Sequence, residues 1–130
     1  MEKKDELVAY RMKRAKVTYN EIHLHLDNKL YHTAASRLYY LCYYAVSALL
    51  ILYGLSPKTH LGVRRLFGDI FIKEGIVSKE SGKCFNELYN LRQTGDYDDF
   101  KKITKEMVEE LSNPAKELID EIEKLIKKEL

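Results

Sequence analysis

The uncharged and mostly apolar stretch LYYLCYYAVSALLILYG from Leu38 to Gly54 constrains the fold of this chain more than any other feature. A surface helix is apolar along one stripe, whereas this segment is apolar nearly all round at the helical period, so it must be buried on more than one side. It is shorter than the roughly 20 apolar residues that cross a bilayer, and it contains five tyrosines. We therefore predict the core helix of a small domain and no membrane-spanning segment.

The rest of the chain has the spacing of amphipathic helices and no sustained strand-like alternation. We expect residues 1–130 to form a single all-α domain, an antiparallel up-and-down bundle of four long helices plus one short helix. Capping residues, prolines and glycines set the expected boundaries. These predict helices over residues 5–28, over residues 31–53 with a stop at Gly54, from a cap at Ser56 with Pro57 first to about Gly75, from a cap at Ser78 to a stop at Gly95, and onward from a cap at Thr104.

Apolar stripes within these helices predict the core. Pro114 lies inside the last stripe, so we expect a kink there or a break at Asn113. The stripes are Val8, Met12, Ala15, Tyr19, Ile22 and Leu26; Val63, Leu66, Phe67 and Ile70; Phe85, Leu88 and Leu91; and Met107, Leu111, Ala115, Leu118, Ile122 and Leu125.

Charge and cysteine content narrow the class of protein. With 22 basic and 20 acidic side chains the net charge is +2, which gives no strong attraction to nucleic acid or membrane. The two cysteines, Cys42 and Cys84, form no CxxC motif, which fits a reducing compartment better than a disulfide framework or a zinc site. The first residues contain no apolar stretch that would indicate a signal peptide. We expect a cytoplasmic protein.

Patterns for metal, cofactor and nucleophile sites are missing from the sequence. His23 and His25 are two apart on a helix and point to different sides, and no Glu-x-x-His pair occurs. No dinucleotide fingerprint, P-loop or nucleophile elbow is found. Cys42 lies within the apolar helix, where an inert buried thiol is expected. The basic run RMKRAK, residues 11–16, is interpreted as a solvated face, with RNA phosphate contact as the alternative. We expect no metal and no cofactor.

Arg92 is the most informative charged residue. It follows Phe85 by seven positions and Leu88 by four, which places it on the inward edge of its helix. An arginine directed at a core needs a partner or a cleft. Asp96 and Asp98 are within reach along the chain. Two interpretations stay open at this point: a structural ion pair, or a polar cleft in which Arg92 binds a phosphate.

The apolar helix also raises the question of a second chain. A small bundle offers few helices to cover it, so a face formed by Tyr40, Tyr44 and Ser47 is predicted to be a homodimer interface, because tyrosines are enriched at interfaces. The alternative is that the segment is the central helix of its own bundle.

Several motifs resemble those of the HEPN domain (higher eukaryotes and prokaryotes nucleotide-binding), most of all its stand-alone archaeal and bacterial members. They are AASRLYYLCYYAVSALLILYGLSPKTHLGVRRLFGDIFIKEG, with a small-x-Arg-x-Tyr-Tyr start, then Pro57-Lys58-Thr59-His60 with Gly62-Val63, and later LYNLRQTGDYDDF. The resemblance covers about residues 34–100. It implies an up-and-down helical bundle with a short extra helix, usually a homodimer, often paired with a small nucleotidyltransferase in toxin–antitoxin modules.

Many HEPN proteins are ribonucleases that carry an arginine followed, after four to six residues, by a histidine. This chain keeps Arg92 but has Tyr97, Asp98 and Asp99 at the following positions and no histidine. A tyrosine, whose pKa is roughly 10, is a poor proton carrier near neutral pH. His60 is the other candidate, entering the same cleft from the preceding loop, although helix capping explains a Thr-His pair there equally well.

Three functions follow from the resemblance. The first is a non-catalytic or weakly catalytic HEPN module that binds RNA, a nucleotide or a partner nucleotidyltransferase. The second is an active metal-independent ribonuclease toxin that uses Arg92 with His60 or Tyr97. The third is a structural dimeric adaptor. The missing histidine favours the first, so we lean against an enzyme. The candidate nucleotide- or RNA-binding residues are Arg92, Asp96, Tyr97, Lys58 and His60.

Overall fold

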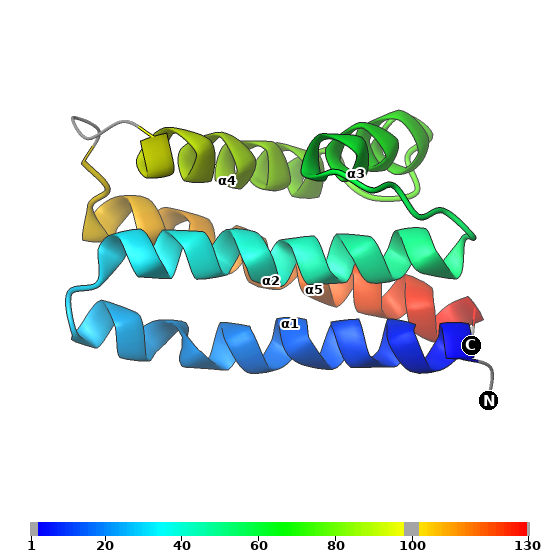
Figure 1. The fold of residues 1–130 in the computed structure, drawn as a ribbon, viewed down its shortest axis with the longest axis horizontal. Coiled ribbons are helices and arrows are strands. Elements are labelled where there is room, and N and C mark those ends of the chain that lie inside the picture. Colours follow the sequence, from blue (N-terminus) through cyan, green and yellow to red (C-terminus); the bar gives the residue numbers. More distant parts are fainter. Residues whose placement is uncertain (1–2, 98–101, 130) are drawn as a thin grey trace.

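The computed structural model describes residues 3–97 and 102–129, and the described part of the chain is helical with no strand. The elements are α1 (Lys3–Asp27), α2 (Tyr31–Leu52), α3 (His60–Leu66), the π-helix η1 (Phe67–Ile72), α4 (Lys79–Tyr97) and α5 (Lys105–Glu129) (Figure 1). The long helices α1, α2, α4 and α5 alternate in direction, and both chain ends lie at the same end of the bundle. The all-α bundle expected from the sequence is confirmed.

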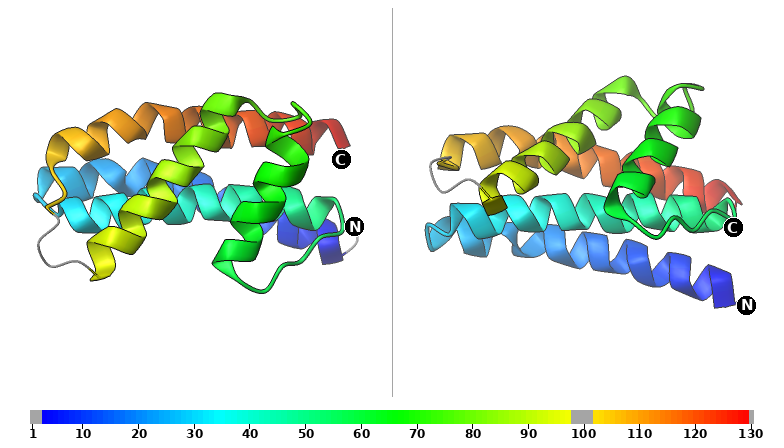
Figure 2. Two further views of the ribbon diagram at one scale, coloured as in Figure 1. Left: turned by 90° about the horizontal axis from the view of Figure 1, so that it is seen from above. Right: turned by 45° about the horizontal axis from the view of Figure 1, so that its top comes forward.

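The helices are arranged in layers around α2. Figure 1 shows α1 on one side of α2 and the pair formed by α3 and α4 on the other. Seen from above in Figure 2, α4 crosses obliquely over α2 and α5, and α3 with η1 lies beside it. As a result α2 contacts α1, α3, α4 and α5.

This central position explains why α2 is so apolar. Its 22 residues have the length and composition of a helix that could cross a membrane, yet 61% of its most apolar stretch is buried inside the protein. Ser47 is only 7% exposed, while Tyr40 and Tyr44 are half-buried. The four neighbouring elements therefore cover more of α2 than the sequence suggested, and a core helix is sufficient to account for its composition. The predicted dimer interface on this face stays a prediction.

Two of the predicted N-terminal caps are confirmed and one is wrong. The Ser78 hydroxyl accepts a hydrogen bond from the Ser81 amide at 3.2 Å, and the Thr104 hydroxyl accepts one from the Met107 amide at 3.2 Å. The third helix begins later than expected, at His60, because Thr59 rather than Ser56 is its cap.

The register of the core changes at η1. The sequence placed Ile70 inside, whereas Ile70 is half-buried and Phe71 is fully buried. A π-helix contains more residues per turn than an α-helix, so it shifts the inward face by about one position. The stop at Gly75 is confirmed by its φ of 75°, and Gly54 after α2 has a φ of 79°. Both values lie in the left-handed region that glycine adopts without strain.

The last two helices differ from the prediction in where they end or break and in which residues face the core. α4 does not stop at Gly95 but continues to Tyr97. α5 is one helix through Pro114, so a break at Asn113 is wrong. Most of the predicted stripes are buried. In α5, however, Val108 and Ile126 are buried, whereas Met107 and Leu125, which were expected inside, are only half-buried. Because apolar residues are adjacent at these positions, the pattern leaves the inward direction uncertain by one residue.

Candidate functional site: an arginine–histidine cluster

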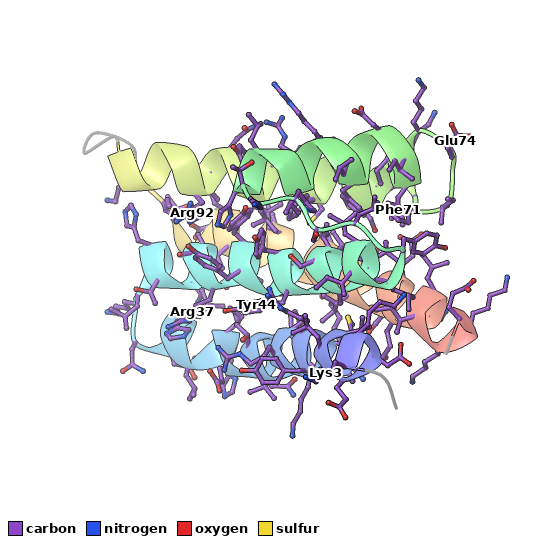
Figure 3. The ribbon with its side chains drawn as sticks, turned by 45° about the vertical axis from the view of Figure 1, so that its right-hand side comes forward. Lys3, Arg37, Tyr44, Phe71, Glu74 and Arg92 are labelled. Atoms are coloured by element: carbon purple, nitrogen blue, oxygen red, sulfur yellow. The ribbon has the colours of Figure 1, made fainter. Side chains whose placement is uncertain are left out.

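Arg92 lies on α4 and reaches toward α2 (Figure 3). Its Nη2 donates a hydrogen bond of 2.8 Å to the hydroxyl of Tyr40. The guanidinium carbon is 5.0 Å from the ring centroid of Tyr40 and 5.5 Å from that of Tyr39, which are cation–π distances. The side chain is half-buried, as the sequence led us to expect. The predicted partners Asp96 and Asp98 have side chains outside the described part of the structure.

His60, the first residue of α3, belongs to the same cluster. Its Nδ1 is 2.7 Å from the hydroxyl of Tyr39. Its ring stacks on Tyr43 with centroids 4.4 Å apart and planes 20° from parallel, and it meets the edge of Tyr40 at 6.1 Å. The Thr59 side chain accepts a hydrogen bond from the Gly62 amide at 2.9 Å. The cap is therefore Thr59, and the imidazole of the next residue is left to face α2.

Tyr39, Tyr40, Tyr43, His60 and Arg92 together form what we call the arginine–histidine cluster. The three tyrosines come from α2, His60 from α3 and Arg92 from α4, so the cluster exists only when these elements pack together. The imidazole of His60 and the guanidinium of Arg92 both contact Tyr39 and Tyr40. Sequence reasoning named His60 and Arg92 but not the tyrosines as parts of a site. The Tyr-Tyr pair of the small-x-Arg-x-Tyr-Tyr motif is the signal that could have identified two of them.

Burial and charge set the protonation states in this cluster. Burial lowers the pKa of His60 below its ordinary value, and the positive charge of Arg92 lowers that pKa further. Burial also raises the pKa of Tyr39 well above the usual range, so its hydroxyl keeps its proton. At neutral pH the cluster therefore presents a permanent cation beside an uncharged imidazole. The hydrogen bond between His60 and Tyr39 fits either imidazole tautomer.

A groove of about 430 Å³ adjoins the cluster. Tyr43, which stacks on His60, forms part of its wall, and Arg11 is the charged residue in its lining. The other lining residues come from α1, α2 and the loop that follows α2, and they are Leu7, Ser47, Leu50, Ile51, Gly54, Leu55, Ser56 and Pro57. The stacked tyrosine therefore has an open space beside it on the α1 side of α2.

The remaining candidate residues are not placed in the cluster. Lys58 is exposed, two residues before His60. Asp96 and Tyr97 belong to the last turn of α4, and their side chains lie outside the described part of the structure. In the basic run of α1, Arg14 stacks over Tyr44 at 5.5 Å and Lys16 pairs with Glu123. Among the side chains that the structure describes, no group of three or more from His, Cys, Asp and Glu comes together.

This chain belongs to the HEPN domain family, whose model matches residues 8–125. It is 39% identical over 126 residues to a UPF0332 protein of Thermotoga maritima, which covers 97% of this chain and 96% of that protein. Two proteins of Methanocaldococcus jannaschii are also similar. "Putative toxin MJ0605" is 38% identical over 101 residues, or 78% of this chain and 75% of that protein. "Putative toxin MJ0142" is 42% identical over 85 residues, or 65% of this chain and 58% of that protein.

Proposed function

We propose that this protein is a toxin-like HEPN module that binds a phosphate group of RNA or of a nucleotide at the arginine–histidine cluster and cleaves RNA weakly or not at all. The observation that carries the proposal is the position of Arg92. Its guanidinium lies between α4 and α2, held by the Tyr40 hydroxyl and the faces of two tyrosine rings. Two similar proteins are named as toxin candidates, which supports the wider functional class.

An anion suits this arrangement better than other ligands. A guanidinium presents several N–H donors in one plane and binds phosphate oxygens in pairs. Tyrosine rings beside it offer flat surfaces on which a base can stack, and such stacking contributes roughly 1–3 kcal/mol per base. Tyr40 and Tyr43 are both half-buried, so each ring keeps some exposed surface. Phosphate and base would thus be recognised together.

The same geometry argues for slow chemistry. Metal-free cleavage of RNA needs a base that removes the proton from the 2′-hydroxyl and an acid that gives a proton to the leaving 5′-oxygen. Between these transfers the 2′-oxygen bonds to phosphorus and the bond to the 5′-oxygen breaks. His60 has a lowered pKa, which suits the base and not the acid. Losing one proton-transfer group typically costs about 10² to 10⁴ in rate.

A second candidate function is an active metal-independent ribonuclease that uses Arg92 with His60. The observation in its favour is that α3 brings His60 into the same tyrosine cluster as Arg92, although the two are far apart in the sequence. An uncharged imidazole beside a guanidinium could accept a proton while the guanidinium stabilises the phosphate. Tyr97 remains the other candidate acid or base, and this rests on the sequence alone.

One pair of assays separates the two. Cleavage of a fluorescent RNA is followed in chelator, and RNA binding is followed by anisotropy, for the native protein, Arg92→Ala, His60→Ala and the exposed control Arg65→Ala. We expect Arg92→Ala to lower affinity at least tenfold more than Arg65→Ala, with cleavage near background throughout. Toxin-like cleavage that His60→Ala abolishes would establish the ribonuclease instead. Equal binding by all four proteins, together with cleavage at background in all of them, would refute both.

The proposal extends to partners. A homodimer through α2 and a small nucleotidyltransferase antitoxin are both expected from the family resemblance, and the exposed surface of Tyr40 and Tyr44 supports a contact there. A purely structural adaptor would need neither Arg92 nor His60 to face a ligand. The binding comparison above therefore also tests the adaptor function.

A further inference from the structure

Beyond the arginine–histidine cluster, a polar seam continues between α3 and α4. On α3, His60 and Arg64 lie one turn apart, and on α4 the residues Arg92, Tyr89 and Asn86 follow one another at intervals of three. Residues three or four apart on a helix share a face. Figure 2 shows α3 and α4 side by side in the layer above α2. The two rows therefore run along the same boundary between the helices.

Tyr89 connects the two parts of this seam. Its ring meets the edge of Tyr39 at 6.0 Å, and Tyr39 is in turn part of the cluster around Arg92. The guanidinium of Arg64 also lies over the Tyr89 ring, at 4.7 Å. Arg64 and Arg92 are thus separated by two tyrosine rings that contact each other.

Arg64 is held in one orientation. Its Nε donates a hydrogen bond of 2.9 Å to the Asn86 side-chain oxygen, and stacking on Tyr89 fixes the guanidinium plane. Within the described part of the chain, its two Nη nitrogens donate no hydrogen bond. A guanidinium fixed through Nε and one face keeps its outer N–H groups for a phosphate, and little conformational entropy is lost on binding.

Arg64 also lines a groove of about 360 Å³ between α3–η1 and α4. The charged side chains in its wall are the cations Arg64, Lys79 and Lys83 and the carboxylate of Glu87. Glu87 is 4.0 Å from Lys83, an exposed pair of little strength. The groove consequently has an excess of positive charge, within a chain whose net charge is +2.

We propose that this groove is a second phosphate-binding site, so that single-stranded RNA runs from Arg92 past Tyr89 to Arg64 and on toward Lys83. The inference rests on the proposed function, because it extends the strand held at the first site. Tyr89, whose ring lies under the Arg64 guanidinium, would separate the two phosphate contacts. The substrate class is then an oligonucleotide, and a mononucleotide would fill only the first site.

The test compares two probes and two matched pairs of variants. The probes are adenosine monophosphate and a fluorescent single-stranded RNA of about eight nucleotides, each measured at several salt concentrations. Arg64→Gln is paired with Arg65→Gln, its exposed neighbour on α3. Lys83→Gln is paired with Lys105→Gln. Both lysines are exposed and each has a glutamate four residues on, at 4.0 and 3.6 Å.

The expected result is selective for length and for position. Arg64→Gln should weaken binding of the eight-nucleotide RNA roughly fivefold or more and reduce the salt slope of log K by about 0.7, the value for one phosphate contact on a single strand. Its affinity for adenosine monophosphate should stay as in the native protein. Lys83→Gln should act in the same direction, and both control variants should match the native protein.

Each other outcome overturns the extension. If Arg64→Gln and Arg65→Gln weaken RNA binding alike, the loss reflects non-specific electrostatic attraction and the groove is not a phosphate-binding site. If Arg64→Gln weakens adenosine monophosphate equally, Arg64 supports the first site only. If Lys83→Gln and Lys105→Gln bind the RNA equally well, the second phosphate site is also refuted. Because the Lys83 side chain is 80% exposed, its replacement should not disturb folding, so this variant tests the groove even if Arg64→Gln folds poorly. If the native protein binds neither probe, the proposed function fails as well.

Discussion

Glu121 on α5 holds the start of α4, and its removal gives the clearest test of how the site is positioned. The carboxylate accepts hydrogen bonds from the Ser78 amide at 2.9 Å, the Ser78 hydroxyl at 3.0 Å and the Ser81 hydroxyl at 2.7 Å. Ser78 is also the cap of α4, and α4 carries Arg92. The direction of the helix that supplies the arginine thus depends on one side chain from another element.

The magnitude follows from what Glu121→Ala leaves behind. Ser81 is only 4% exposed, so its hydroxyl loses its partner in a place that water reaches poorly, which costs about 1–3 kcal/mol. Ser78 is half-buried and can bond to water instead, so its loss adds less, about 0.5 kcal/mol. We expect Glu121→Ala to lower the free energy of unfolding by about 1.5–3.5 kcal/mol in total.

Urea denaturation followed by circular dichroism measures this change, with Glu117→Ala as the control. Glu117 lies one turn earlier on α5 and is exposed, so this variant makes the same change in charge and helix propensity. It should alter the free energy of unfolding by no more than about 0.5 kcal/mol. If the two variants differ by less than that amount while the denaturant slope stays constant, Glu121 does not hold α4 and the reasoning is wrong.

Three further predictions concern the cluster and the interface. Tyr40→Phe removes one described hydrogen bond of Arg92 and should cost about 0.5–1.5 kcal/mol, less than a fully buried case because Arg92 is half-buried; an unchanged urea midpoint would count against the bond. The folded-state pKa of His60 is lowered from 6.5, so the stability that its uncharged form contributes is complete above pH 6.5 and is lost as the pH falls below that value. The free energies of unfolding of the native protein and His60→Gln, measured against pH, should therefore diverge only on the acid side. Light scattering at micromolar concentration should give a dimeric mass that Tyr44→Lys splits and the exposed α1 variant Leu24→Lys does not; a monomeric native protein would exclude the interface.

Local patterns predicted most of the fold because its determinants are local. Periodicity located the long helices, and the hydroxyl caps at Ser78 and Thr104 were identified from residue type alone. The errors occur where two local signals compete. Ser56 and Thr59 could each cap the third helix, and the structure uses the later one. Gly95 has a helix-stopping residue type, yet α4 continues past it, because glycine permits a left-handed turn without requiring one.

The site was harder to predict because its contacts span long distances in the sequence. Arg92 was identified as an inward-facing arginine, but its described partner Tyr40 lies 52 residues earlier. Tyr39 and His60 are 21 residues apart. No periodicity encodes such pairs, since they depend on how α3 and α4 pack over α2. Tyr40 was interpreted as an interface residue, and the structure shows that its hydroxyl and ring also contact a guanidinium, while the predicted interface stays a prediction.

The motif Pro57-Lys58-Thr59-His60 with Gly62-Val63 can be explained by the placement of one imidazole. Thr59 caps α3, and the Gly62 amide is its donor. A Cβ at position 62 would lie 3.0 Å from the Thr59 hydroxyl oxygen and 3.1 Å from Pro57, so a larger residue would push against both. Val63 is buried in the core and anchors the first turn of α3 there. Each of these residues restricts how α3 can begin, and the residue whose position they restrict most is His60. A loop that served only to cap a helix would not need its first side chain 2.7 Å from a buried tyrosine hydroxyl, so the motif is better explained by the site than by the fold.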